Sequence, residues 1–240
     1  ITPVHWGKVE KRTWFSLIVM LLTVPLMLYL SVVLFHGKQY LAMSLIVVFF
    51  AMVPFFMVFE GRKPQAREIM VIAVLAAIGV AGRAAFYMIP SFKPIAAIVI
   101  LTGVSFGGEA GFLVGCMIMM VSNMFFGQGP WTPWQMFSYG LIGFLAGILF
   151  QKGILKARKI PLCIYGFLSV IFIFGGIMNP ASILMSYGRI TWKSLIAFYI
   201  SGIPVDLVQA TSTVFFLWIL SHPLLEKLER IKKKYGLIER

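Results

Sequence analysis

The chain has 240 residues and a formal net charge of +13, and 60% of its residues are hydrophobic whereas only 12% are charged. Because a soluble domain is nearer half apolar and a quarter charged, this composition excludes a water-soluble globule and indicates an integral membrane protein. The apolar runs have the length of helices and lack the ten-residue alternation of a membrane barrel, so the predicted class is all-α.

Eight apolar segments follow one another along the chain and predict membrane-spanning helices at residues 14–35, 40–59, 68–88, 94–106, 110–125, 134–150, 161–178 and 192–220. The fourth and fifth are short. The fourth gives roughly 20 Å of helix, less than the hydrocarbon core of about 30 Å, so it must be tilted, broken or shielded by protein. We expect a hinge at Gly107-Gly108-Glu109, an interruption at Gly202-Ile203-Pro204, and a charged amphipathic tail over residues 223–235.

Positive residues are distributed unevenly over the predicted loops. Eight spans place both termini on one side of the membrane, and sixteen Lys and Arg residues fall on that side. The other side has four, Lys38, Lys93, Arg189 and Lys193, and Arg83 lies within a span. Because cytoplasmic loops retain Lys and Arg, both termini are predicted to be cytoplasmic. The same retention accounts for the net charge, so we expect no nucleic-acid partner.

The first two predicted spans differ from the six that follow. The first two spans are continuous and almost free of polar residues, whereas the last six carry the glycines, the interruptions and the intramembrane charges. We therefore predict an N-terminal extension with two transmembrane helices at 1–62, a six-helix core at 63–222 and a basic cytoplasmic tail at 223–240. The cysteines lie inside apolar segments and no histidines have ligand spacing, so no disulfide or metal site is expected.

A stripe of small residues marks the third span. Ala73, Ala77, Ala81 and Ala85 follow one another at four-residue spacing and form a shallow groove on one face of the helix. In lipid, small residues allow helices to approach closely. The groove is interpreted in two ways: as a packing face within this chain, or as a docking face for another membrane protein.

Two ionisable residues, Arg83 and Asp206, lie within predicted spans. Charges at such depth are costly and usually mark a site or a buried pair. Each is separated by 14 residues from the cytoplasmic end of its helix, which at 1.5 Å per residue places both roughly 21 Å above the inner surface. We predict that they lie at one level in the outer half and are positioned to pair. A structural ion pair and a contact to a ligand both remain open.

The predicted outer loops and the neighbouring helix ends are rich in side chains suited to recognition. The candidates are Tyr87, Phe92, Lys93, Asn123, Gln128, Trp131, Trp134, Gln135, Asn179 and Gln209. Interfacial Trp and Tyr commonly anchor a protein in the bilayer. Trp131 and Trp134, however, flank Thr132-Pro133 in a loop that is rich in Gly and Pro, with amides close by. Flat aromatic groups with amides suit a large, polar, partly planar solute.

The chain lacks the motifs that would supply energy or catalysis. There is no P-loop, so no ATPase is expected in this chain. There are no paired intramembrane carboxylates and no arrangement of nucleophile and base, so no catalytic residues and no bound cofactor are expected. An ion-coupled pump would need more ionisable groups or an inverted repeat. For a small, basic membrane protein without an energy source of its own, we expect a partner protein that supplies the energy for uptake.

Residues from about 65 to the C-terminus resemble the substrate-binding S component of energy-coupling factor (ECF) vitamin transporters. The resemblance is carried by the stripe Ala73, Ala77 and Ala81, the SFKP loop at 91–94, the segment GVSFGGEAGFLVGCMIMMVSNMFFGQGPWTPWQ and the following GLIGFLAGILF. Among subfamilies the chain most resembles the S component assigned to cobalamin. The first two spans depart from the usual six-helix pattern.

The resemblance implies a six-helix bundle in the bacterial plasma membrane that binds a vitamin near its outer face. The bundle would dock through Ala73, Ala77 and Ala81 onto a membrane coupling (T) subunit, which joins two cytoplasmic ATPases that bind the ATP. Residues 87–93 and 123–135 and the last span, with Arg83 and Asp206, would surround the ligand. Cobalamin is the expected ligand, ahead of folate, pantothenate and riboflavin.

Two other classes of function stay open at this point. A membrane enzyme acting on lipid or isoprenoid substrates would use Arg83, Asp206 and the basic inner loops to hold phosphate. It predicts turnover by the isolated chain. A structural membrane subunit without a ligand predicts that substitution of loop residues such as Trp131 leaves function intact.

Overall fold

The structure is a computed structural model that describes residues 49, 52–53 and 66–235. All the secondary-structure elements in this part of the chain are helices: α3 (Ala66–Ala85), α4 (Ile95–Phe106), α5 (Gly108–Phe126), α6 (Thr132–Gln151), α7 (Lys159–Ser169), the π-helical η1 (Val170–Phe174), α8 (Gly175–Tyr187) and α9 (Trp192–Tyr235). The predicted all-α class is confirmed for these residues. The first predicted span, nearly all of the second, the boundary at 62/63 and both termini lie outside them.

Six apolar helical segments correspond to the six predicted spans of the core. Five are long and apolar enough to cross a membrane, with α7, η1 and α8 forming one segment, Lys159–Tyr187, and α4 is shorter. The segment formed by α7, η1 and α8 extends beyond the predicted span at 161–178 and passes through Pro180. It ends where Gly188 adopts the left-handed conformation (φ +68°) that commonly terminates helices. The predicted loop therefore begins nine residues too early.

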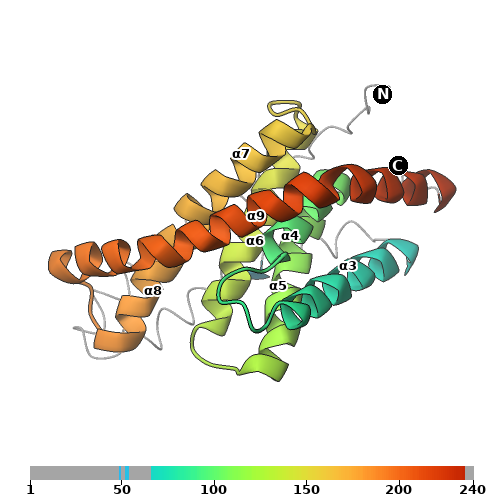
Figure 1. The fold of residues 1–240 in the computed structure, drawn as a ribbon. Coiled ribbons are helices and arrows are strands. Elements are labelled where there is room, and N and C mark those ends of the chain that lie inside the picture. Colours follow the sequence, from blue (N-terminus) through green and yellow to red (C-terminus); the bar gives the residue numbers. More distant parts are fainter. Residues whose placement is uncertain (1–48, 50–51, 54–65, 236–240) are drawn as a thin grey trace.

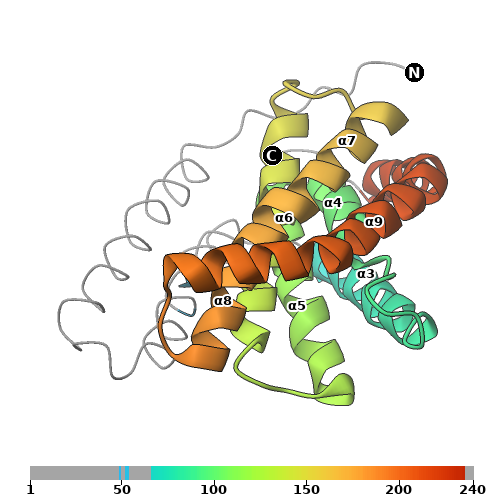
Figure 2. The same cartoon turned by 60° about the vertical axis from the view of Figure 1, so that its left-hand side comes forward.

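The short helix α4 is the centre of the fold. All 12 of its residues are buried, and it packs against α3, α5, α6, α7 and α9. Figures 1 and 2 show α4, α5 and α6 together in the middle of the molecule. Helix α9 runs across these three helices, and α3 lies beside α4 and α5. Because neighbouring helices cover α4 on every side, it has no need to span a bilayer by itself, which confirms the option of shielding by protein.

Glycines bring α4, α5 and α6 into backbone contact. A Cβ atom added to Gly103 would lie 2.1 Å from the carbonyl oxygen of Gly143, and one added to Gly111 would lie 2.6 Å from the same oxygen. Conversely, a Cβ on Gly143 would lie 2.5 Å from the carbonyl oxygen of Gly111. In an apolar environment such close approach gains dispersion contacts between whole helices. The glycines of GVSFGGEAG and GLIGFLAG therefore hold the core together.

The predicted hinge between the fourth and fifth spans is confirmed. α4 ends at Phe106, Gly107 adopts φ +100°, and α5 begins at Gly108. This backbone conformation is favourable for glycine and strained for other residues. Since α5 begins directly after the hinge, it reaches 19 residues and is longer than predicted.

The predicted interruption at Gly202-Ile203-Pro204 is wrong. α9 is a single helix of 44 residues that continues through Pro204 and Pro223, and so passes from the core into the tail. Gly202 serves helix packing, because a Cβ there would lie 2.7 Å from Asn179 Oδ1. A proline costs one backbone hydrogen bond, whereas a full break in an apolar environment would expose several polar groups, so prolines are tolerated within membrane helices.

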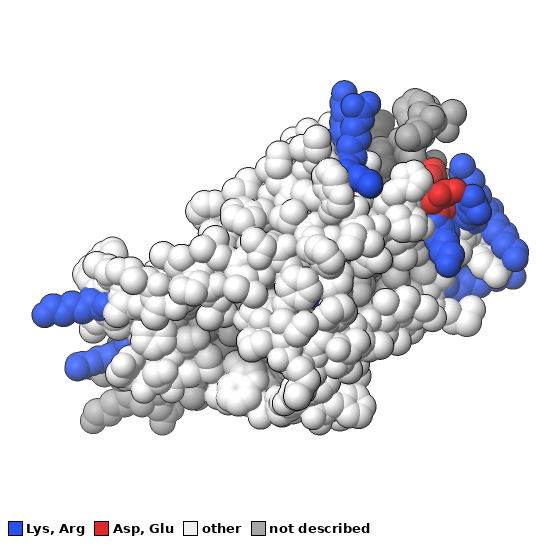
Figure 3. Space-filling model, viewed as in Figure 1, with Lys and Arg blue, Asp and Glu red and all other residues white. Residues whose placement is uncertain are grey.

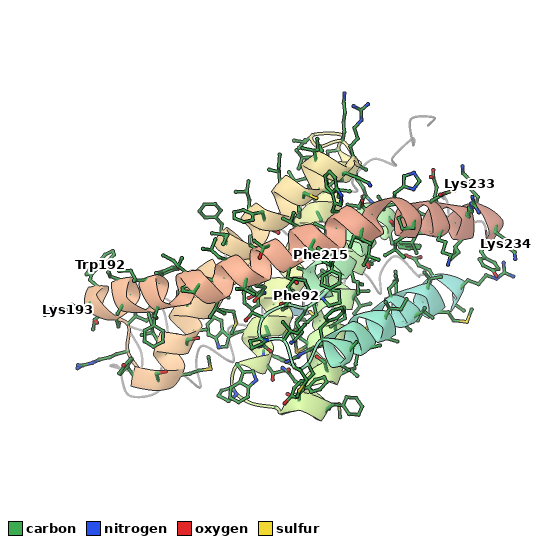
Figure 4. The ribbon with its side chains drawn as sticks, in the orientation of Figure 1. Phe92, Trp192, Lys193, Phe215, Lys233 and Lys234 are labelled. Carbon is green, nitrogen blue, oxygen red and sulfur yellow. The ribbon has the colours of Figure 1, made fainter. Side chains whose placement is uncertain are left out.

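Charged residues gather at two ends of the molecule. Figure 3 shows Lys and Arg at both ends, with a wide uncharged band between them. Lys233 and Lys234 lie at one end, and Trp192 and Lys193 lie at the other (Figure 4). We call the end that carries Lys233 and the α6–α7 loop the basic end. This separation fits the predicted charge asymmetry; the placement of the basic end in the cytoplasm stays a prediction.

Candidate functional site

A network of polar side chains joins α3, α5 and α6 at the end opposite the basic end. Arg83 lies in the last turn of α3, and its Nη1 donates to Ser122 Oγ and to Asn123 Oδ1, each at 2.6 Å. Asn123 Nδ2 donates in turn to Thr132 Oγ1 and Gln135 Oε1, each at 2.9 Å. We call these five residues the Arg83 cluster. It brings together three residues predicted from the sequence, Arg83, Asn123 and Gln135.

The Arg83 cluster holds a guanidinium group in place through buried partners and leaves some of its N–H donors unused by the described residues. Ser122 and Asn123 are completely buried, and Asn123 uses both its oxygen and its nitrogen in the network, so its orientation is set. A guanidinium has five N–H donors. Among the described residues, the hydrogen bonds of Arg83 come from Nη1 alone. The half-buried guanidinium therefore keeps donors for an acceptor from outside the described chain.

An aromatic pair borders the guanidinium. The rings of Tyr87 and Phe126 are stacked with centroids 4.8 Å apart. Arg83 Cζ lies 5.4 Å from the centroid of Phe126, a distance suited to cation–π attraction. Tyr87 is exposed, so one side of this pair is open. Together the cation and the flat rings form a surface on which a planar, acceptor-bearing group could stack and accept hydrogen bonds.

Tyr139 and Gln209 extend the polar region towards α9. Gln209 Nε2 donates to Tyr139 Oη at 2.8 Å, and both residues are buried. Tyr139 lies near Arg83. It also lies four residues after Gln135, so both side chains emerge from the same side of α6. The predicted residue Gln209 is thus linked to the neighbourhood of the Arg83 cluster by its hydrogen bond to Tyr139.

Lys93 organises the loop that follows α3. Its Nζ donates to the carbonyl oxygens of Phe86 and Ile89, each at 2.6 Å, and of Tyr87 at 3.3 Å. Burial lowers the pKa of Lys93, and the nearby Arg83 charge lowers it further. The three carbonyl oxygens offset this by solvating the ammonium. Lys93 therefore shapes the loop that carries Tyr87.

Phe92, another predicted residue, lies in an aromatic contact between this loop and α9. Its ring centroid is 5.5 Å from that of Phe215 and 5.3 Å from that of Phe216, and Phe92 and Phe215 can be followed in Figure 4. Ser212 Oγ of α9 donates to the carbonyl oxygen of Lys93 at 3.1 Å. The loop is thus fastened to α9 beside the Arg83 cluster, and Phe92 contributes packing to it.

The side chains of the remaining predicted residues of the α5–α6 region are not part of this hydrogen-bond network. Trp134 packs with Phe112, Phe137 and Met52 in a separate apolar cluster. Successive helix positions differ by about 100°, so Trp134 and Gln135 face different sides of α6. Gln128 Nε2 donates to a backbone oxygen of α5 in the exposed loop, and Trp131 is exposed there as well.

The predicted contact between Arg83 and Asp206 is wrong. Asn179 Nδ2 donates to Asp206 Oδ2 at 3.1 Å, whereas Arg83 is bonded to α5. Gly175 allows this contact between α8 and α9, because a Cβ there would lie 2.7 Å from Asp206 Oδ2. Sequence depth predicts the height of a residue in a helix but says nothing about the neighbour that it faces. The predicted residues Asn179 and Asp206 therefore form a second, separate polar pair.

Three members of the polar region were not singled out from the sequence: Ser122, Tyr139 and Thr132, although Thr132 lies within the predicted range 123–135. Ser122 precedes Asn123 in α5, and Thr132 is within the loop that supplied Gln135. The short side chains of Ser and Thr carry no charge and commonly form hydrogen bonds to the backbone of their own helix, so they do not stand out as site residues. Tyr139 has a usable signal, because it follows Gln135 by one helical turn.

The alanine stripe is open to the surroundings. Ala73, Ala77 and Ala81 are exposed, whereas α3 buries the opposite face with Ile72 and Leu75. Residues 66–235 of this chain therefore do not pack against the stripe, and packing against the first two predicted spans lies outside the described residues. Which partner covers the stripe stays a prediction.

Comparisons with known proteins identify the family. A model of the family "ECF-type riboflavin transporter, S component" matches residues 63–230. A UPF0397 protein of Vibrio atlanticus (strain LGP32) is 30% identical over 125 residues, covering 49% of this chain and 68% of the relative. A UPF0397 protein of Aliivibrio salmonicida (strain LFI1238) is 32% identical over 121 residues, covering 47% and 64%. No solved structure matches.

The matched region contains the whole helical core that the structure describes, from α3 to most of α9. S components are substrate-specific transporter subunits rather than enzymes, and they reside in the bacterial membrane, where the apolar helices of this chain fit. Because the match covers well over half of the chain, this multi-pass membrane protein belongs to the family of ECF-type riboflavin transporter S components.

Proposed function

We propose that the chain captures a vitamin with the Arg83 cluster and delivers it inward together with a coupling (T) subunit and two ATPases. The observation that carries the proposal is the half-buried Arg83 guanidinium, which among the described residues is held by Ser122 and Asn123 through one nitrogen only. A buried cation in an apolar protein is costly. A ligand acceptor bonded to the remaining donors would reduce that cost.

The surroundings of Arg83 favour a planar heteroaromatic ligand with carbonyl or ring-nitrogen acceptors. Tyr87 and Phe126 supply a flat surface, and Gln135 supplies an amide. Riboflavin fits this description and is the vitamin in the family's description. Cobalamin, which the sequence resemblance favours, is larger and rich in amides, and would also have to use the exposed loop with Gln128 and Trp131. We therefore place riboflavin first and cobalamin second.

Calorimetry on the purified full chain tests this proposal. The titrants are riboflavin, cobalamin, folate and pantothenate. We expect one of them to bind with a dissociation constant below about 1 µM, which corresponds to about −8 kcal/mol. Binding of cobalamin alone would reverse our order of candidates. If folded, monodisperse protein binds none of the four, capture of a vitamin by this chain is ruled out for this panel and the proposal fails.

The open alanine stripe supports docking onto the T subunit. Substitution of Ala77 with tryptophan would fill the groove and prevent close helix approach. We expect co-purification of the T subunit and the ATPases to fall to at most about a tenth, since overpacking costs roughly 1–3 kcal/mol, while vitamin binding is unchanged. The matched control is Ile196→Trp at an exposed position of α9. Equal recovery of partners with both variants would disprove the docking face.

A further inference from the structure

A shallow, open cavity of about 590 Å³ lies at the basic end, over the α6–α7 loop and the first turn of α7. It is lined by Ile154, Leu155, Lys156, Arg158, Lys159, Ile160 and Pro161. Among the described residues, the lining contains three cations and no acidic residue. Figure 3 shows Lys and Arg projecting from the part of the surface where Figure 1 places the α6–α7 loop. Charge complementarity therefore calls for an anionic occupant.

The cations are presented by an ordered loop. The backbone N–H of Leu155 donates to the oxygen of Leu149 at 3.1 Å, and that of Arg158 donates to Lys156 at 2.7 Å. Lys159 Nζ lies 5.3 Å from the ring centroid of Trp218, which ties the cavity to α9. α7 begins at Lys159 without a side-chain cap, so the positive end of its helix dipole adds to the field of the three cations.

An apolar track leads away from the cavity along α7. Ile160 in the cavity wall is followed at four-residue spacing by Ile164, Leu168 and Phe172, and these four side chains are between 46% and 72% exposed. Residues four apart lie near one face of a helix. The cationic cavity thus continues into a strip of apolar surface directed into the uncharged band. A small soluble anion would have no use for this strip, whereas the acyl chains of a lipid would cover it.

We propose that this cavity binds the phosphate headgroup of an anionic phospholipid, with Lys156, Arg158 and Lys159 around the phosphate and the acyl chains along Ile160, Ile164 and Leu168. Basic segments next to membrane helices attract such headgroups. The cavity adjoins one end of α6, whereas the Arg83 cluster involves Thr132 and Gln135 at the other end, about 30 Å away along the helix. This inference is therefore independent of the proposed vitamin site.

Native mass spectrometry of the purified full chain tests the site. The protein is titrated with dioleoylphosphatidylglycerol and, separately, with dioleoylphosphatidylcholine, which has the same acyl chains and no net charge. We expect wild-type protein to retain phosphatidylglycerol with at least about tenfold higher affinity, because each basic residue near an anionic surface contributes roughly a fivefold effect. The triple variant K156Q/R158Q/K159Q should lose this preference.

The control variant K227Q/R230Q/K233Q removes the same amount of charge from the exposed part of α9 and should keep the preference. A similar loss in the control would show that net charge alone is responsible and would overturn the site. Equal retention of the two lipids by wild-type protein would overturn it as well. Excess inorganic phosphate should leave the lipid adduct in place; complete displacement would identify a site for free phosphate and refute the lipid assignment.

Discussion

Substitution of Gly143 with valine is expected to prevent α4, α5 and α6 from closing around their common contact. A Cβ at this position would lie 2.5 Å from the carbonyl oxygen of Gly111. The obstacle is backbone, which cannot rotate away as a side chain can, so the helices would have to separate along their length. We expect the free energy of unfolding to fall by at least about 3 kcal/mol, at the upper end of overpacking effects.

The measurement is unfolding of the purified protein in mixed detergent micelles as the fraction of sodium dodecyl sulfate is raised, followed by circular dichroism. Gly176 provides a matched control, because it lies in α8 and a Cβ there would meet no atom within 4 Å. Gly176→Val should stay within about 0.5 kcal/mol of wild type. Similar unfolding of both variants would show that the glycine contact does not hold the core.

Substitution of Arg83 with methionine is expected to abolish capture of the ligand while the chain remains folded. Methionine keeps much of the length and apolar character of the side chain but removes every N–H donor and the charge. If the ligand accepts hydrogen bonds from the free guanidinium donors, its affinity should fall at least about 100-fold, which is about 2.7 kcal/mol. Calorimetry with the vitamin that binds wild-type protein measures the loss.

Two further variants separate the possible causes of such a loss. Arg189→Met removes an exposed arginine from the loop between α8 and α9 and should bind normally. Arg83→Lys keeps the charge but lacks the planar fork of donors, and should recover only part of the affinity. Wild-type affinity in Arg83→Met would contradict the assignment of the site. A folding defect would be recognised by a lower unfolding midpoint in the absence of ligand.

The helices of the core are predictable because each is an uninterrupted apolar run, and hydrocarbon permits few alternatives to a helix. The errors concern prolines and glycines. Pro180 and Pro204 would end a helix in water, where freed backbone groups can bond to solvent, and each lies within a helix here. Gly107 is the informative exception, since its positive φ does separate two helices.

The candidate site was predicted only in part, for a related reason. Arg83, Asn123 and Gln135 stand out because polar groups at membrane depth are costly and must be used. Their composition does not say which groups meet. Trp134 lies next to Gln135 in sequence and yet packs in another cluster, because one step along a helix turns the side chain by about 100°.

The sequence by itself determined the membrane class, the six helices of the core and the small-residue face of α3, because composition and periodicity follow directly from the cost of placing polar groups in hydrocarbon. The tertiary structure alone decided which polar residues share a site. It joined Arg83 to Asn123 and Asp206 to Asn179. The reason is physical: the partners come from different helices, and the angle at which each helix packs depends on the glycine contacts that set how closely the backbones approach.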